Sequence, residues 1–483
     1  MTTTLDELRR LTAAAAKAAP IAAAASDAER AGWLRAVADR LDEHADELIE
    51  IADSETRLGS TRLKGEVART TGQLRLFADV ITEGSYLEAI IDHADPSATP
   101  PKPDLRRVLH PLGPVAVFSA SNFPFAFSVA GGDTASALAV GCPVIVKAHS
   151  GHLALSLRMA ELVGAALEEA GAPAGMFGLV TGREAGNALV GDPDITAVGF
   201  TGSVAGGRAL FDIAASRLDP IPFYGELGSI NPVVLTAGAV ERRSDELAKG
   251  LVGSFTLGVG QFCTKPGVVF VPSGAGFEDA VAQSVDGAAG GPLLTDRIAE
   301  AFPGGIRRLL DDEAVRLVSG AAEQDAVNDG ATPVVLATTA AAVRERPETL
   351  LEEVFGPTTL LISYDSEDEL LASLAVVPGS LTATVHAEDD EEVEGIVDAL
   401  RRRAGRVLFA GWPTGVAVNW AQHHGGPYPA TTSLYTSVGA TAARRFQRPV
   451  AYQSAPERLL PPALREDNPL GIPRRVDGIL VLP

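Results

Sequence analysis

Cysteine and basic residues are both scarce in this sequence. Only two cysteines, Cys142 and Cys263, occur in 483 residues. Such a count excludes a disulfide framework and is typical of a reducing compartment, so we expect a cytoplasmic protein. The chain carries 40 Lys and Arg against 62 Asp and Glu, which gives a formal net charge of −22. This charge argues against a nucleic-acid-binding surface and favours solubility.

Long apolar runs are also missing. The Ala-rich stretch 11–25 lacks the leucine-rich centre of a signal peptide, and we expect a helix there. The uncharged stretch 111–132 is long enough to span a bilayer, but Asn122, Pro124 and several serines interrupt it. The sequence therefore predicts no targeting signal and no membrane segment.

The length of the chain predicts two or three domains, because 483 residues are many for one core. From Gly113, short β-prone runs alternate with segments of helical length. This alternation is typical of an α/β protein with a parallel, doubly wound sheet. Strands are expected at 114–118, 143–146, 176–180, 197–200 and 221–223. Helices are expected at 27–52, 62–81, 125–140, 153–170, 184–190 and 204–217.

A second βα pattern follows Asn231 and looks like a catalytic domain that runs to about residue 430. The expected helices are 245–257, 295–310 and 387–403, and the expected strands are 268–271, 381–386 and 407–410. The tail, 431–483, is apolar and rich in proline. We expect it to be tied down on a neighbour.

Unusual polar and glycine residues follow the predicted strands of the first region. Asn122 follows the first strand, Lys147 the second, Gly202 and Ser203 the fourth, and Glu226 the fifth. Parallel α/β sheets bind ligands at the carboxyl ends of their strands, so we expect these residues to line a site.

Cys263 lies between glycines in the stretch 258–267, with no second cysteine near it. Small neighbours let the backbone approach a ligand closely, and a thiol presented in this way is a candidate nucleophile. The alternative is an inert core residue, which is the expected role of Cys142 in its apolar run. The pair His423-His424 has no cysteine or acidic cluster beside it, so no metal site is predicted.

Six short motifs, in this order along the chain, together resemble the aldehyde dehydrogenase superfamily. They are Ser121-Asn122-Phe123-Pro124, Val146-Lys147-Ala148-His149-Ser150, Phe200-Thr201-Gly202-Ser203, Glu226-Leu227-Gly228-Ser229, Gly260-Gln261-Phe262-Cys263 and Glu352-Glu353-Val354-Phe355-Gly356-Pro357. The likeness is closest to the α-ketoglutarate semialdehyde (2,5-dioxopentanoate) dehydrogenase branch. It rests there on the stretches 69–75, 127–137, 425–430 and 465–471.

The resemblance implies a Rossmann-type cofactor-binding domain over 1–230 and an α/β catalytic domain over 231–430. A small oligomerisation element would combine 97–112 with the tail 431–483. The implied assembly is a homo-dimer or homo-tetramer.

Oxidation of an aldehyde by hydride transfer first needs a tetrahedral adduct, which Cys263 can supply as a thiolate. Departure of hydride to a nicotinamide leaves a thioester, and Glu226 is the candidate base for the water that hydrolyses it. The side-chain amide of Asn122 and the backbone N–H of Cys263 would stabilise the oxyanion. The alternatives are a capping carboxylate for Glu226 and a turn residue for Asn122.

A G-x-G-x-x-G fingerprint is absent, so the cofactor must be bound in another way. Gly202 and Ser203 open a helix whose free N–H groups can hold a pyrophosphate, although Ser203 would also serve as a plain N-cap. Lys147 would reach the adenosine ribose or its phosphate. By resemblance, Glu353 would hold the nicotinamide ribose and Phe355 would pack near the ring. Members that prefer NAD commonly carry an acid three places after the lysine, whereas the neutral Ser150 stands here, so NADP is expected and NAD is tolerated.

The substrate expected from this resemblance is a small oxo-acid semialdehyde. Its carboxylate would meet Arg69 and Gln73, which lie at i and i+4 on one predicted helix, although a surface arginine is the common alternative. His424 would line the aldehyde entrance or be structural.

There are four alternative interpretations, and the sequence speaks against the last three. A broad-specificity or fatty aldehyde dehydrogenase would share the same core residues. A coenzyme-A-acylating relative would not need Glu226, so the presence of this residue speaks against that alternative. A cysteine hydrolase needs a histidine beside its thiol, and no histidine stands in a comparable motif. A catalytically silent protein of the same fold has no need to keep Cys263, Glu226 and Asn122 together.

Overall fold

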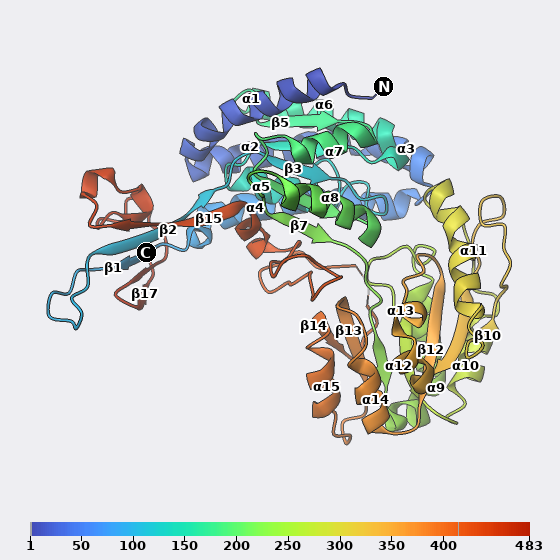
Figure 1. Cartoon of the computed structure of the whole chain (residues 1–483). Helices are drawn as coiled ribbons and strands as arrows, with labels where there is room; N and C mark the ends of the chain where they lie inside the picture. Colours follow the sequence, from blue (N-terminus) through green and yellow to red (C-terminus); the bar gives the residue numbers. More distant parts are fainter. Residues whose placement is uncertain (1, 414) are drawn as a thin grey trace.

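The computed structural model describes residues 2–413 and 415–483, and its strands form three sheets. The first two sheets lie in separate lobes, and the third projects from the first lobe as an arm (Figure 1). No helix among the described residues is long and apolar enough to cross a membrane.

The first sheet is fully parallel and has the order β5-β4-β3-β6-β7. Its strands are β3 (Val115–Phe118), β4 (Val144–Lys147), β5 (Phe177–Val180), β6 (Ala197–Thr201) and β7 (Phe223–Glu226). The chain moves outward from β3 in one direction and then in the other, which confirms the doubly wound sheet. The fifth strand begins two residues later than predicted, so that Glu226 is its last residue. In such a sheet, ligands bind at the carboxyl edge where the strand order reverses.

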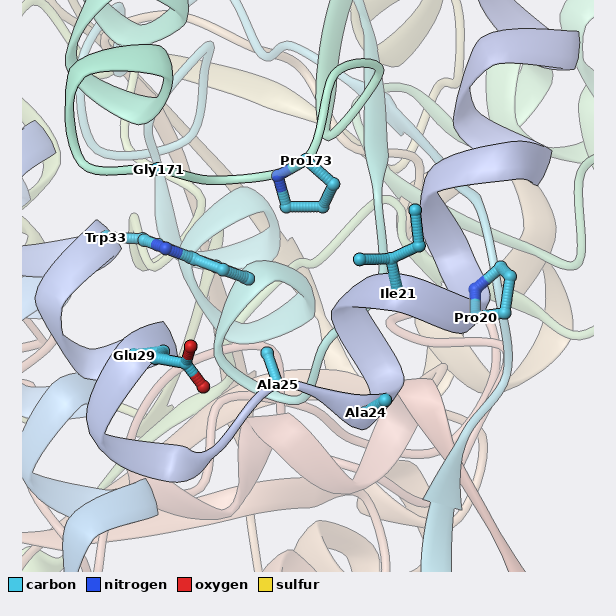
Figure 2. A pocket seen from close by; sticks show the side chains of 8 residues that line it. All are labelled: Pro20, Ile21, Ala24, Ala25, Glu29, Trp33, Gly171 and Pro173. Atoms are coloured by element: carbon cyan, nitrogen blue, oxygen red, sulfur yellow. The ribbon is translucent and has the colours of Figure 1, made fainter.

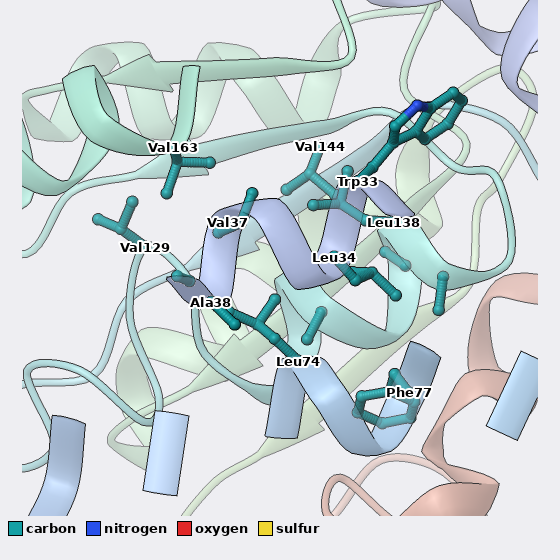
Figure 3. Close-up of a cluster of buried hydrophobic side chains, with 14 of the residues drawn as sticks. Trp33, Leu34, Val37, Ala38, Leu74, Phe77, Val129, Leu138, Val144 and Val163 are labelled. Atoms are coloured by element: carbon teal, nitrogen blue, oxygen red, sulfur yellow. The ribbon is translucent and has the colours of Figure 1, made fainter. Parts of the chain in front are cut away.

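Helices cover both faces of this sheet. One face carries α2 (Asp27–Glu43), α3 (Ala45–Thr56), α4 (Ser60–Glu83), α5 (Gly132–Ala139) and α6 (Leu153–Glu169), and the other α1 (Leu5–Ala24), α7 (Arg183–Gly191) and α8 (Val204–Ser216). Successive strand residues point to opposite faces. Val117 accordingly belongs to the first core and Phe118 to the second. The first core packs Trp33 and Leu34 of α2 near Val144 of β4 (Figure 3).

Two helices of this lobe differ from the prediction. Only α5, the second half of the stretch 125–140, is helical, because the first half forms turns held by a buried carboxylate. The N–H groups of Phe125 and Ala126 donate to Oε1 of Glu66 at 2.8 and 3.1 Å. The expected helix 27–52 is broken at His44 into α2 and α3.

The second sheet has the order β10-β11-β12-β9-β8-β13-β14 and is parallel except for β10. Its strands are β8 (Val233–Leu235), β9 (Val268–Pro272), β10 (Arg316–Ser319), β11 (Val334–Thr339), β12 (Thr358–Tyr364), β13 (Ser380–His386) and β14 (Ala404–Phe409). Its helices are α9 (Ala237–Phe255), α10 (Phe277–Val285), α11 (Asp296–Leu310), α12 (Ala340–Glu345), α13 (Pro347–Leu350), α14 (Glu367–Leu374) and α15 (Glu394–Leu400). Buried side chains of this lobe form one core on each face of the sheet.

The helix predicted over 387–403 is much shorter, because only Glu394–Leu400 is helical. Before it, the chain forms a loop around the carboxylate of Glu391. This carboxylate accepts hydrogen bonds from the N–H groups of Gly238 and Glu388 and from the hydroxyl of Thr236. The loop is therefore fixed to the start of α9.

The third sheet has the order β15-β2-β1-β16-β17. It combines β1 (Ile90–Asp92) and β2 (Leu105–Pro111) with β15 (Gln447–Gln453), β16 (Arg474–Val476) and β17 (Ile479–Val481) of the tail. Short 3₁₀ turns are η1 (Ser85–Leu87), η2 (Ser150–His152), η3 (Ala440–Phe446), η4 (Glu457–Leu459) and η5 (Pro462–Leu464). The tail is thus tied down on β1 and β2 of its own chain.

Candidate active site

Three side chains from distant parts of the sequence converge at the carboxyl edge of the first sheet. The sulfur of Cys263, a ring nitrogen of His424 and a carboxylate oxygen of Glu226 all lie within 4.8 Å of one another. Nε2 of His424 is 3.6 Å from Sγ of Cys263 and 3.0 Å from Oε1 of Glu226. A single nitrogen therefore faces both the thiol and the carboxylate.

Each of these residues is placed by a different element. Glu226 ends β7, and Cys263 lies in the loop between α9 and β9. His424 lies after β14, and its backbone N–H donates to the hydroxyl of Thr436 at 2.8 Å. The hydroxyl of Ser437 donates to Oε2 of Glu226 at 2.7 Å. Both oxygens of the Glu226 carboxylate are therefore held in place.

The geometry corrects two expectations about His424. The sequence suggested that no cysteine or acidic group accompanies this histidine, and that no histidine is partnered to the thiol. Both expectations are wrong, since His424 contacts Cys263 and Glu226. The partners are 161 and 198 positions away in the chain, so local sequence could not reveal them.

Burial and charge set the protonation of this cluster. Burial raises the pKa of the Cys263 thiol well above its ordinary value, the charge of Glu226 raises it further, and Arg69 opposes both effects. Burial would also raise the pKa of Glu226. The charge of His424 and the hydrogen bonds from His424 and Ser437 outweigh burial, however, and hold the Glu226 pKa below its ordinary value. The carboxylate is thus ionised at neutral pH, whereas the thiol needs help to lose its proton.

The backbone of Cys263 is fixed by Asn231. Its side-chain amide donates to the carbonyl oxygens of Cys263 and Lys265 at 2.8 and 2.9 Å. Its Oδ1 accepts the hydroxyl of Ser229 at 2.6 Å and the N–H of Thr382 at 3.1 Å. Ser229 thereby joins the segment after Glu226 to the loop that carries Cys263.

Asn122 lies in the loop after β3 and is buried. One N–H of its amide donates to the carbonyl oxygen of Gln261 at 3.0 Å, two positions before Cys263. Its other N–H has no partner among residues 2–413 and 415–483. The amide therefore lies beside the loop that carries Cys263, with one donor to spare.

Arg69 of α4 provides a positive charge at this site. It stacks on Phe123 and Phe127, with the guanidinium carbon 5.6 and 5.3 Å from the ring centroids. It lies within electrostatic reach of Cys263 and Glu226 and forms no ion pair in the described part of the chain. Gln73, the other substrate-contact candidate, is buried near Gly132 at the start of α5.

The predicted cofactor residues line the rim of the first sheet. Ser203 is the N-cap of α8, accepting the Gly206 N–H at 3.2 Å, and this helix end is exposed. Gly202 has no room for a side chain, because a Cβ there would lie 2.8 Å from the ring of Phe200. Lys147 ends β4, half-buried and without a carboxylate partner among the described residues, and Ser150 is exposed at the start of η2.

Glu353 approaches the same rim from the second lobe. Its Oε2 accepts the N–H of Ser229 at 3.3 Å and would lie 3.0 Å from a Cβ at Gly228. Val204, the first residue of α8, would lie 2.7 Å from that same Cβ. Only glycine therefore fits at position 228, between the first residue of α8 and Glu353. Phe355, two residues further on, is half-buried.

Lys265 joins the loop that carries Cys263 to the loop that carries Glu353 and Phe355. Its Nζ donates to the carbonyl oxygens of Val354 and Thr358 at 2.7 and 3.0 Å. Burial lowers the pKa of Lys265 to about 8 and raises the pKa of Glu353 to about 7, and the attraction between the two opposes both shifts. Sequence reasoning missed Lys265, Asn231 and Ser437, whose roles depend on contacts between distant segments.

A surface hollow lies away from the Cys263 cluster, between α1, α2 and the turn after α6 (Figure 2). It measures about 560 Å³ and is lined mainly by apolar side chains. Its acidic residue, Glu29, already accepts hydrogen bonds from Ser26. Nothing in this hollow can do redox chemistry.

The doubly wound sheet, with a thiol and a carboxylate together at its carboxyl edge, is that of an aldehyde-oxidising enzyme, and the chain belongs to the aldehyde dehydrogenase family, which it matches over residues 2–428. Two curated relatives cover almost the whole chain. It is 48% identical to alpha-ketoglutaric semialdehyde dehydrogenase 2 of Azospirillum brasilense, over 98% of this chain and 90% of the relative. It is 41% identical to alpha-ketoglutaric semialdehyde dehydrogenase of Acinetobacter baylyi, over 99% and 92%. The resemblance drawn from the motifs is confirmed.

Solved structures share the fold at lower identity. An NADP-dependent enzyme of E. coli has a TM-score of 0.78 and 24% identity, over 93% of this chain and 90% of that one. A 1-pyrroline-5-carboxylate dehydrogenase from Thermus with bound NAD has a TM-score of 0.79 and 22% identity, over 94% and 86%. As a member of the aldehyde dehydrogenase family with two curated relatives above 40% identity, the protein is an enzyme that oxidises an aldehyde to a carboxylate with a nicotinamide dinucleotide.

Proposed function

We propose that the protein is an α-ketoglutarate semialdehyde dehydrogenase that forms 2-oxoglutarate, with Cys263 as nucleophile and His424 as its acid–base partner. The observation that carries this proposal is the convergence of Cys263, His424 and Glu226 beside the unpaired guanidinium of Arg69. Two relatives of 48% and 41% identity are named alpha-ketoglutaric semialdehyde dehydrogenases, which supports this substrate.

The chemistry begins with the thiol. With a proton on Nε2, His424 can stabilise the thiolate of Cys263 while it also contacts Glu226. The thiolate adds to the aldehyde carbon, and the oxyanion that forms is met by the free N–H of Asn122 and the backbone N–H of Cys263. When bound, a nicotinamide held by Glu353 and Phe355 would supply the hydride acceptor, and loss of hydride converts the adduct of Cys263 into a thioester.

Hydrolysis of the thioester returns the enzyme to its starting state. Glu226, ionised and held by Ser437, takes a proton from a water molecule as that water attacks the thioester carbon. The sulfur of Cys263 leaves as a thiolate and regains its proton from Nε2 of His424, while the proton on Glu226 and that of the carboxylic acid product pass to solvent. An ionised Glu226 favours this step over transfer to a coenzyme A thiol.

Arg69 is the proposed partner of the substrate carboxylate. Nε and one Nη of the Arg69 guanidinium are buried without a hydrogen-bond partner, which is costly, and an anionic substrate would relieve this cost. Arg406 of β14 offers a second cation, because it is half-buried, interacts electrostatically with Cys263 and has an unpartnered Nε. The apolar rings of Phe123 and Phe127 favour a broad-specificity or fatty aldehyde dehydrogenase as the second candidate.

For the cofactor we propose NADP, with NAD tolerated. Lys147, Ser150, Gly202 and Ser203 would hold the adenosine and phosphate groups, and Glu353 and Phe355 the nicotinamide end. The exposed Ser150 puts no negative charge near a 2′-phosphate. Ser150→Glu should shift the ratio of kcat/KM values toward NAD, and a wild-type enzyme that already strongly prefers NAD would defeat this proposal.

A cytoplasmic homo-dimer or homo-tetramer is the proposed assembly. The outer strand of the third sheet, β17, exposes apolar side chains along an unpaired edge, with Ile479 and Leu480 at 69% and 58% exposure. Such an edge tends to pair with another chain. The outer strand β14 of the second sheet ends in Phe409, which is 63% exposed.

A substrate screen tests the central proposal. Purified enzyme is assayed with α-ketoglutarate semialdehyde, uncharged aliphatic aldehydes and aromatic aldehydes, by absorbance of the reduced cofactor. In Arg69→Gln, kcat/KM for the semialdehyde should fall by roughly 10- to 100-fold, the cost of a lost charged hydrogen bond, while the uncharged aldehydes change little. Lys64→Gln, on the same helix, is the control. Equal losses for charged and uncharged aldehydes would refute the role of Arg69.

A further inference from the structure

The cluster of Cys263, His424 and Glu226 has the composition of a transition-metal site. Sulfur, imidazole nitrogen and carboxylate oxygen are the three ligand types that zinc takes in proteins. The three atoms come from rigidly held residues, because Asn231 fixes the backbone of Cys263 and Ser437 holds the Glu226 carboxylate. His424 and Glu226 are almost fully buried, at 0% and 3% exposure.

The distances between these atoms match a tetrahedral ion. With Zn–S of about 2.3 Å and Zn–N and Zn–O of about 2.0–2.2 Å, the edges of the tetrahedron measure about 3.3–3.6 Å. The separation of Sγ of Cys263 from Nε2 of His424 is 3.6 Å, and that of Nε2 from Oε1 of Glu226 is 3.0 Å. All three atoms fit within 4.8 Å. The remaining separation, from Sγ of Cys263 to a carboxylate oxygen of Glu226, is at most 4.8 Å and would shorten to about 3.6 Å around the ion.

We propose that Cys263, His424 and Glu226 together bind one zinc ion, with a water molecule in the fourth position, and that this ion blocks the enzyme reversibly. The sulfur that holds zinc can no longer add to an aldehyde, and the carboxylate can no longer take a proton from water. The blocking effect rests on the proposed function of these three residues, whereas the binding itself does not.

The ligand set also determines which ions should bind. Mg²⁺ and Ca²⁺ prefer oxygen ligands, so they should leave turnover unchanged. Thiolate and imidazole favour Zn²⁺ and Co²⁺. The positive charges of Arg69 and Arg406 act on Cys263 and oppose a dication. The affinity should therefore be lower than that of a closed structural zinc site.

Binding is measured first, independently of turnover. Chelator-treated enzyme without cofactor is titrated with Zn²⁺ in competition with a chromophoric chelator, and with Co²⁺ by absorption spectroscopy. We expect one ion per chain, visible cobalt bands of tetrahedral intensity and a near-ultraviolet thiolate-to-cobalt band. Cys263→Ser should abolish the thiolate band, and His424→Gln and Glu226→Gln should each weaken zinc at least roughly tenfold.

Two variants serve as matched controls. Cys142→Ala removes the other cysteine, which is fully buried, and His423→Gln removes the neighbouring histidine. Both should bind zinc like the wild type. Zinc that binds equally well in Cys263→Ser, or no stoichiometric zinc in the wild type, would overturn the proposal.

Turnover is then measured in the wild type at increasing free zinc. Inhibition should be relieved by a chelator and by excess aldehyde, because the ion and the substrate compete for the same sulfur. If zinc binds through the Cys263 sulfur and turnover continues at the full rate, the assignment of Cys263 as nucleophile fails while the metal site stands.

Discussion

Nε2 of His424 lies 3.0 Å from Oε1 of Glu226, although the two residues are 198 positions apart in the chain. The same nitrogen is 3.6 Å from Sγ of Cys263. A thiol whose pKa is raised by burial needs such a neighbour to lose its proton at neutral pH. His424 thus links the thiol of Cys263 to the carboxylate of Glu226.

We expect His424→Gln to slow the enzyme. Glutamine can keep a hydrogen bond to Glu226 but cannot carry the positive charge that stabilises the thiolate, so kcat/KM should fall by about 100- to 10,000-fold. Alkylation of Cys263 by iodoacetamide, followed by mass spectrometry, should slow in parallel. His423→Gln is the control and should alkylate like the wild type. A wild-type alkylation rate in His424→Gln would contradict the role of this residue.

Glu226→Gln should separate the two halves of the reaction. The thiolate can still add to the aldehyde, so a first equivalent of reduced cofactor should appear in a rapid burst. The thioester should then persist, because the amide cannot take a proton from water, and the steady rate should fall by about 100-fold or more. Rapid-mixing absorbance and intact mass measure the burst and the acyl-enzyme. A full steady rate would mean that another base acts.

The sequence predicted the parallel sheet and the residues at its carboxyl edge, because both follow from local patterns. Alternating strand and helix lengths located β3 to β7, and Cys263 was identified by its glycine-rich surroundings. The partners of the site were not accessible in this way. His424 is placed by Thr436 and Ser437, which lie in a segment without regular secondary structure. The break in the expected helix 125–140 depends on Glu66, which lies on a different helix.

Lys265→Met should weaken cofactor binding without unfolding the enzyme. The change leaves the carbonyl oxygens of Val354 and Thr358 without their donor and removes the cation near Glu353. Hydrogen bonds from a charged donor contribute about 1.5–3 kcal/mol, so the Kd for the dinucleotide should rise by roughly 10-fold or more. Quenching of intrinsic fluorescence measures this Kd, and the exposed Lys102→Met is the control. An unchanged Kd would mean that the loop is held by other contacts.

Arg445→Met should destabilise the folded protein strongly. Arg445 is 2% exposed, and its guanidinium donates to Asp133 of α5 at 2.7 Å. Removing one partner of a buried ion pair leaves an unpaired charge and typically costs about 3–5 kcal/mol. Urea unfolding followed by circular dichroism measures the loss. The double variant Arg445→Met with Asp133→Leu should regain most of it, since an apolar pair leaves no isolated charge, and equal stability of the single and double variants would refute this explanation.

His386 should make stability depend on acidity. It is 1% exposed, both ring nitrogens are unpartnered within the described residues, and it stacks on Trp412 with ring centroids 4.6 Å apart. Burial, together with the charge of Arg243, lowers its pKa from 6.5 to about 4. His386 therefore binds a proton near pH 6.5 in the unfolded chain, but only near pH 4 in the folded chain. The stability contributed by a neutral His386 is present above pH 6.5 and is lost as the pH falls to 4, which amounts to about 3 kcal/mol.

The variant His386→Phe should lose less stability than the wild type between pH 7 and pH 4.5, as measured by urea unfolding at each pH. His93 provides a control of opposite sign. Hydrogen bonds to Asp477 and Glu466 raise its pKa, so its contribution is present at low pH and is lost as the pH rises through that raised value. His93→Gln should therefore lose stability at pH 5 and not at pH 8. Parallel pH profiles for His386→Phe and the wild type would show that His386 does not cause the acid sensitivity.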